Sequence, residues 1–77
     1  MLHLSQLHKL KKGQAGFIEK IDNEELKLAL LQLGITEGDE CKFTGAAPLQ
    51  DPLSIMVNRT KVTLRKRDAA SIWIRKK

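Results

Sequence analysis

The chain has 77 residues, a formal net charge of +5 and one cysteine. A chain of this length forms one domain, over residues 1–77, and buries only about 60% of its unfolded surface, which disfavours a deep active-site cavity. The single cysteine excludes an internal disulfide framework and fits a reducing compartment. The N-terminus lacks the apolar core of a secretory signal, and the longest nearly apolar stretch, residues 28–35, is far short of the ~20 residues that cross a bilayer. We therefore expect a soluble cytoplasmic protein.

The N-terminal residues predict a short turn followed by a strand. Leu4, Leu7 and Leu10 recur every three residues, as in a short helical turn or an apolar anchor. Residues 14–21 are rich in strand formers, and Gly16 within them indicates a bulge or a close backbone approach. On one parity of this strand lie Ala15, Phe17 and Ile21, with Ile18 on the other.

The most regular pattern predicts an amphipathic helix at about residues 23–33. Asp22 is the expected N-cap, with Glu25 at the capping-box position, and Gly34 ends the helix in a left-handed conformation. The core-facing stripe consists of Leu26, Leu30 and Leu33.

The second half of the chain predicts a strand, a β-hairpin and a last strand. Cys41 and Phe43 lie on the inward side of a strand at 40–44, and residues 58–60 form the tight turn of the hairpin. Asp68 is expected to cap a short helical turn near 68–70. The inward positions of the hairpin and the last strand are Leu53, Ile55, Val57, Val62, Leu64, Ile72 and Ile74.

These elements predict a mainly β fold of about five short strands with one short amphipathic helix. Closure into a small barrel is favoured over an open sheet, because closure removes exposed strand edges. An SH3-like barrel matches this size.

Both prolines of the chain lie in one loop, residues 47–52, with Asp51 immediately before the second. Each proline fixes its own φ and restricts the residue before it, so the loop is stiff and loses little entropy on docking. The loop is either a preformed protein contact made by Leu49, Gln50 and Asp51, or a structural corner.

Three motifs, LLQLGITEG at 30–38, APLQDPLSIMV at 47–57 and VTLRKRDAASIWI at 62–74, follow one another in the order typical of the FeoA family, which the chain resembles. Further matches are Leu7 with Leu10 and Gly13, and Ile18 with Ile21. The resemblance implies an SH3-like barrel that binds the cytoplasmic side of the FeoB-type membrane GTPase transporter and supports ferrous iron uptake. It implies no catalysis, no cofactor and no iron site of its own.

Two positions depart from the family pattern. Gln50 replaces the glycine of AP-x-G-DP, which strains the chain if the position needs a positive φ. Ala29 stands where the family often carries an arginine, so no contact through that side chain is expected. A similar fold closes the C-terminal end of iron-dependent repressors of the diphtheria toxin repressor type, so a regulatory module of that kind is an alternative.

The candidate metal ligands are His3, His8 and Cys41, whose spacing suits neither a helical i, i+4 pair nor a short chelate. We expect structural or solvated roles for all three and therefore no metal site. No histidine or carboxylate pair has a catalytic spacing, and Asp51 is expected to cap the loop. There is no phosphate-cradling glycine loop, so GTP chemistry belongs to the partner, and no small-molecule substrate is expected.

Several apolar side chains lie off the predicted core stripes. Trp73 and Met56 point outward on their strands, and tryptophan is enriched at binding hot spots. Alternatively, Trp73 packs under the N-terminal leucines. Leu28 and Leu31 are covered either by the barrel or by a partner. The predicted partner-binding residues are Leu28, Leu31, Pro48, Leu49, Gln50, Asp51, Pro52, Met56 and Trp73.

The basic residues between Lys61 and Arg67 give a second alternative, a small nucleic-acid-binding β-barrel whose affinity falls steeply with salt. Aromatic residues are not interleaved with these bases, which argues against nucleic acid. The same shortage of aromatics argues against proline-rich ligands, which need an aromatic groove. The sequence leaves self-association open.

Overall fold

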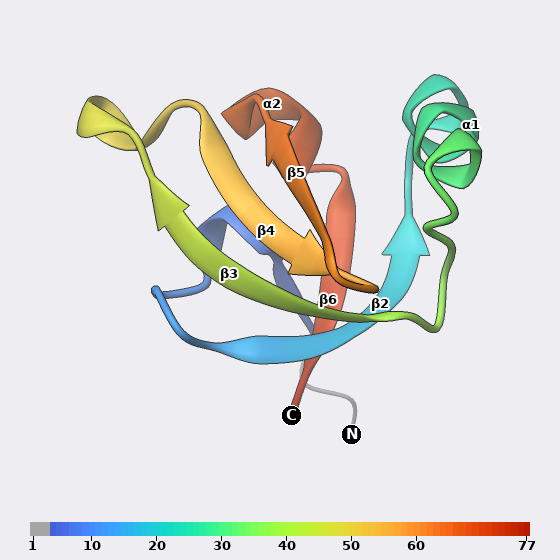
Figure 1. The fold of residues 1–77 in the computed structure, drawn as a ribbon, viewed down its shortest axis with the longest axis horizontal. Helices are drawn as coiled ribbons and strands as arrows, with labels where there is room; N and C mark the ends of the chain where they lie inside the picture. The colour runs from blue at the N-terminus through green and yellow to red at the C-terminus, as the bar shows by residue number, and fades with distance from the viewer. Residues whose placement is uncertain (1–3) are drawn as a thin grey trace.

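The computed structural model describes residues 4–77, so His3 lies outside the described residues. Six strands form one antiparallel sheet in the order β1-β6-β2-β3-β4-β5, which curls around the core (Figure 1). The elements are β1 (Leu4–Gln6), η1 (Leu7–Lys9), β2 (Ala15–Ile21), α1 (Glu24–Gln32), β3 (Glu40–Ala46), η2 (Pro48–Gln50), β4 (Leu53–Val57), β5 (Thr60–Leu64), α2 (Lys66–Ala69) and β6 (Ile72–Lys76). Within the described residues the edge strands β1 and β5 do not pair with each other, but α2, which follows β5, packs against η1, which follows β1. The mainly β class is confirmed.

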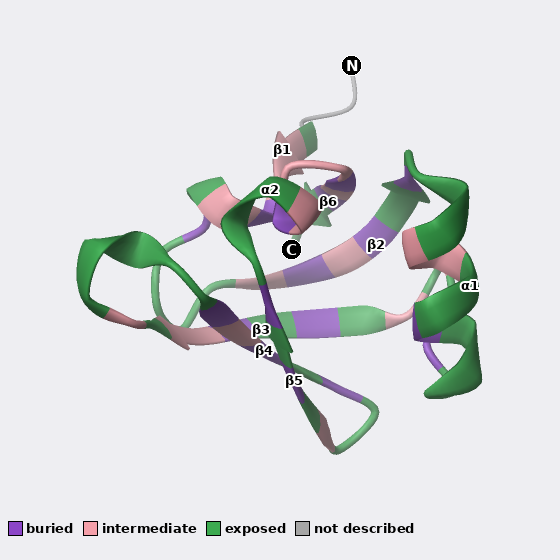
Figure 2. Ribbon diagram, turned by 90° about the horizontal axis from the view of Figure 1, so that it is seen from above, coloured by how far each residue is buried: buried purple, intermediate pink, exposed green. Residues whose placement is uncertain are grey.

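The core confirms the predicted alternation in the second half of the chain. Leu53, Ile55 and Val57 are at most 2% exposed, and the other predicted inward residues of β3, β5 and β6 are also buried. Figure 2 shows buried and exposed segments succeeding one another along the strands, whereas α1 is mostly exposed. The interior of the domain is therefore built by the sheet, and the helix contributes mainly through Leu30.

The N-terminal segment differs from the prediction of a single helical turn. Leu4–Gln6 forms a sixth strand that pairs with the free edge of β6, and only then does a 3₁₀ turn follow at Leu7–Lys9. A leucine every three residues does not distinguish these conformations, because three residues are too few to show a period. Leu7 and Leu10 are buried, as an apolar anchor requires.

In β2 the predicted parity is wrong. The register with β6 shifts between Ile18 and Lys20, and this bulge turns both Ile18 and Ile21 into the core while Phe17 stays half-buried. The close approach predicted at Gly16 is confirmed: a Cβ there would lie 2.5 Å from Ile74 Cγ2 and 2.6 Å from the Arg75 carbonyl oxygen.

The N-cap of α1 is Asn23 and not Asp22. The Asn23 side chain accepts a hydrogen bond from the Leu26 N–H, at 3.0 Å. Asp22 is held outside the helix because its N–H donates to the Ser71 carbonyl, at 2.7 Å. Glu25 therefore does not occupy the third position of a capping box.

At its C-terminus α1 ends as predicted, at Gly34, whose φ is +81°. The N–H of Ile35 donates to Leu30 and that of Gly34 donates to Leu31, both at 2.9 Å, which is the Schellman pattern. Leu30 and Ile35 are both buried. Leu33 is the C-cap and is 54% exposed, so the prediction that it lies in the core is wrong. The last helical residue is Gln32, so the helical spacing that would place Leu33 beside Leu30 no longer applies.

Asp68 does not cap the second helix. It lies inside α2, and the first free N–H of that helix, from Lys66, donates to the carboxylate of Asp51 at 3.1 Å. The capping group therefore comes from the proline loop, fifteen residues earlier in the chain.

Candidate protein-contact surfaces

The outer side of α1 carries three exposed leucines. Leu28, Leu31 and Leu33, named here the α1 leucine cluster, are 59%, 55% and 54% exposed. Leu28 and Leu31 are neighbours on one side of the helix, three residues apart, and Leu33 follows at the C-cap. The alternative left open by the sequence is thus decided: the barrel does not cover Leu28 and Leu31. The exposure of Leu33 was not predicted because Leu33 fits the periodic pattern of the core-facing residues. Its position next to Gly34 is nevertheless a signal that the helix ends there.

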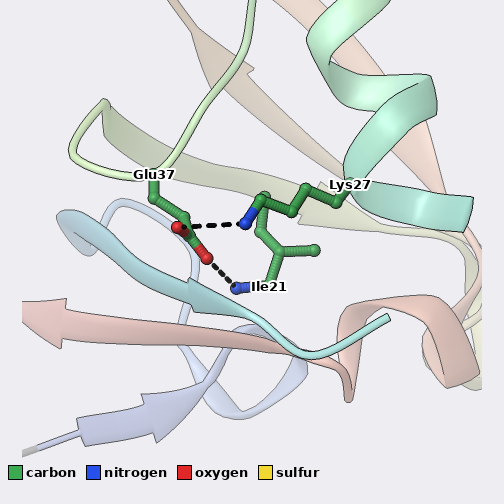
Figure 3. Close-up of polar contacts among 3 residues, drawn as sticks. All are labelled: Ile21, Lys27 and Glu37. Carbon is green, nitrogen blue, oxygen red and sulfur yellow. Dashed lines mark hydrogen bonds and ion pairs between the residues drawn. The ribbon is translucent and has the colours of Figure 1, made fainter. Parts of the chain in front are cut away.

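A polar clamp fixes α1 to the sheet beneath. One carboxylate oxygen of Glu37 accepts the Ile21 N–H at 3.0 Å, and the other lies 3.4 Å from the Lys27 ammonium (Figure 3). The hydrogen bond from Ile21 is the largest cause that lowers the pKa of Glu37, and the charges of Lys27 and Lys20 add to it while partial burial opposes it. The clamp joins the end of β2, the helix and the turn that follows it. The helix that carries the exposed leucines is therefore attached to the sheet.

The β4–β5 turn closes against the same end of the molecule. Asn58 and Arg59 have φ values of +50° and +65°, and both central residues of a type I′ turn have positive φ. The Asn58 amide donates to Asp39 at 3.0 Å and to the Gly34 carbonyl at 3.3 Å. The hairpin turn therefore also contacts Gly34, the residue at which α1 ends.

The proline loop, residues 47–52, lies at the opposite end of the molecule from α1, as both ribbon views show (Figures 1 and 2). Leu49 is 95% exposed, and Leu49 and Gln50 have φ values of +69° and +66°. Gln50 thus occupies a left-handed position, the conformation that glycine adopts without cost. Asp51 caps α2, so this side chain is a structural part of the loop, whereas Leu49 presents an apolar side chain to solvent.

The two outward-facing strand residues lie apart from both ends. Met56, on β4, is 37% exposed and stands between Lys42 and Lys61 in the register. Trp73, on β6, is half-buried between Gln6 and Lys20. Strands β2 and β3 separate β6 from β4. The predicted partner-binding residues therefore do not form one continuous patch.

The candidate metal ligands within residues 4–77 are His8, on η1, and Cys41, on β3. His8 is half-buried, and burial and then the charges of Lys66 and Lys9 lower its pKa. Cys41 is buried in the core, and burial raises the pKa of its thiol to about 11, so it stays protonated at neutral pH. No group of three His, Cys, Asp or Glu side chains in this part of the chain is placed to hold a metal ion. Across the same residues, no helix has the length and apolar character needed to cross a bilayer.

The fold and these surfaces define a small SH3-like module whose most exposed apolar side chains lie on a helix and a loop. The family model of the FeoA domain matches residues 5–76. The chain belongs to the FeoA family. A sequence search of curated proteins found no match.

Three solved structures illustrate the likeness. Iron(II) transport protein A from Clostridium thermocellum is 32% identical, with a TM-score of 0.80 over 88% of this chain and 43% of that one. The zinc complex of FeoA from Stenotrophomonas maltophilia, described as a prokaryotic SH3 domain protein, is 23% identical, with a TM-score of 0.74 over 88% of this chain and 86% of that one. A manganese-dependent transcriptional repressor is 16% identical, with a TM-score of 0.87 over 100% of this chain and 44% of that one. The last two likenesses concern the fold alone.

Proposed function

We propose that this chain is a non-catalytic cytoplasmic accessory protein that binds the cytoplasmic domain of a FeoB-type ferrous iron transporter and supports iron uptake. Membership of the FeoA family supports the partner class. The observation that carries the proposed contact is the α1 leucine cluster, three leucines more than half exposed on one nine-residue helix and its C-cap. Apolar side chains gathered on a rigid support are typical of protein interaction sites.

The arrangement of α1 supports this assignment. The Schellman end at Gly34 and the Glu37 clamp hold the helix without using its outer side. A preorganised apolar surface loses little conformational entropy when a partner covers it. The proline loop, Met56 and Trp73 stay as predicted contacts on other faces of the molecule.

The test is a calorimetric titration of the purified cytoplasmic domain of the transporter, with and without guanine nucleotide. Leu28→Ser combined with Leu31→Ser is expected to weaken binding at least tenfold, because each buried leucine contributes about 1.5 kcal/mol or more. Leu4→Ser is the matched control, since Leu4 is an exposed leucine on β1. Absence of binding by the unaltered chain in both nucleotide states, or equal binding by the double variant, would refute the proposal.

A further inference from the structure

A hollow of about 310 Å³ lies between the loop after η1, which contributes Lys11 and Lys12, and the proline loop, which contributes Gln50. Its apolar floor includes Leu10 and Phe43, which are 5% and 4% exposed. Lys11 and Lys12 stand on one side, and Gln50 stands on the other. The hollow is distinct from the α1 leucine cluster, so a ligand bound in it does not depend on the proposed function.

One wall of this hollow is the unpaired end of a strand. The ladder between β2 and β3 stops at the pair Ala15–Lys42, and the last backbone bond beyond it runs from the Gly13 N–H to the Phe43 carbonyl, at 2.8 Å. The chain then turns away, so the last residues of β3, Gly45 and Ala46, pair with β4 alone, and Thr44 lies at the register shift that precedes them. Gly45 and Ala46 line the hollow, and a Cβ at Gly45 would meet no atom within 4 Å. An open edge beside an apolar floor is suited to an added extended segment.

The charge distribution selects the occupant. Seven of the nine acidic residues lie between Glu19 and Glu40, with only two of the fourteen basic ones. The ion pairs within residues 4–77 use Lys27, Arg75 and Lys77, so Lys11 and Lys12 have no ion-pair partner there. The lining of the hollow itself carries the positive charges of Lys11 and Lys12 and no carboxylate, so it attracts a negatively charged partner.

We propose that this hollow binds an extended acidic peptide segment of a partner protein, which adds as a short strand along residues 44–46. Its main chain runs along the open edge of β3, and its carboxylates face Lys11 and Lys12. A peptide is favoured over nucleic acid because the aromatic ring at this place, Phe43, is buried and offers no face for base stacking. A peptide is favoured over a lipid surface because the open strand edge recognises a main chain.

The test is a fluorescence anisotropy titration of the intact chain with a labelled peptide of alternating valine and glutamate. Binding is expected, and it weakens with salt. Lys11→Gln with Lys12→Gln weakens binding about fivefold, as two partly screened ion pairs predict. The control, Lys20→Gln with Lys76→Gln, removes the same charge outside the hollow and leaves the affinity within about twofold. In ¹⁵N spectra the peptide shifts the amides of residues 11–13 and 44–46 and not those of α1.

Four results would overturn the inference: equal weakening by both lysine pairs, equal binding of a valine–lysine peptide, amide shifts confined to other residues, or retention of single-stranded DNA or phosphatidylserine vesicles without peptide binding. Leu28→Ser with Leu31→Ser should bind the peptide like the unaltered chain. Loss of transporter binding by that variant therefore leaves this inference standing, and loss of peptide binding leaves the proposed function standing.

Discussion

The two ends of this small barrel treat their apolar side chains in opposite ways. At the end with the proline loop, Leu10, Phe43 and Leu53 are buried, and Leu49 is the exposed large apolar side chain there. At the α1 end, one helix buries Leu30 and leaves Leu28, Leu31 and Leu33 exposed. Lys11 and Lys12 line the hollow at the first end, whereas residues 19–40, which include α1, hold seven of the nine acidic residues. An excess of apolar surface on an anchored helix is not needed to fold the barrel, and it is therefore the surface we assign to a partner.

Adjacent leucines of α1 allow the sharpest test of this difference. Leu30→Ala is expected to lower the free energy of unfolding by about 3 kcal/mol, because it leaves a cavity in the core. Leu31→Ala is expected to change it by about 0.5 kcal/mol or less, because the side chain is already exposed. Urea denaturation followed by circular dichroism measures both values. Similar losses for the two variants would show that the outer leucine is part of the core.

At the other end, stability depends on a polar contact. Asp51→Ala is expected to cost about 1 kcal/mol, since it removes the side chain that caps α2 through the Lys66 N–H. Asp51→Asn keeps an acceptor oxygen and should recover most of the loss. Denaturation curves of the two variants decide this, and an alanine variant as stable as the unaltered chain would mean that the cap contributes nothing.

A substitution in the β4–β5 turn, which contacts the α1 end, is expected to increase stability. Arg59 has a φ of +65°, and glycine is preferred at the second central position of such turns. Arg59→Gly is expected to raise the free energy of unfolding by about 0.5 kcal/mol, the relief of left-handed strain less the entropy cost of glycine. A higher thermal midpoint is the predicted observation, and a lower one would indicate that the arginine side chain makes a stabilising contact.

The smallest expected effect concerns pH at the Glu37 clamp. The pKa of Glu37 is lower in the folded chain than in the unfolded one, so its stabilising contribution is complete above the unfolded value and is lost as pH falls through the folded value. Glu37→Gln should remove this part of the acid dependence. Thermal midpoints of both chains, measured from neutral pH down to about pH 3, cover the range in which glutamate ordinarily titrates. If the midpoint of the variant falls with pH as steeply as that of the unaltered chain, the clamp does not contribute to stability.

Much of the sheet could be predicted from the sequence because buried apolar residues recur at every second position in β4, β5, β6 and the first part of β3. The errors lie where a distant contact decides between neighbours. Asp22 and Asn23 are both good caps, and the hydrogen bond from Asp22 to Ser71 makes Asn23 the cap. Likewise, the bulge in β2 depends on its pairing with β6, which no local pattern reveals.

The candidate contact surfaces could be predicted only in part, because they too depend on contacts between distant parts of the chain. Leu28 and Leu31 lie off the helical stripe in the sequence, but only the packing shows that nothing in the barrel covers them. The capping role of Asp51 needs the position of Lys66, fifteen residues away. The local sequence does not indicate that Lys11 and Lys12 line a binding site. The hollow beside them forms only because β3 continues beyond its pairing with β2.

The most direct test of the central claim is a ¹⁵N amide spectrum of this chain during titration with the cytoplasmic domain of the transporter. We predict that the largest shifts or losses of signal fall between Leu28 and Leu33, with the buried strands of the barrel unchanged. Perturbations confined to the proline loop and residues 44–46, or none at saturating concentrations of the domain, would contradict the assignment of the α1 leucine cluster as the binding surface.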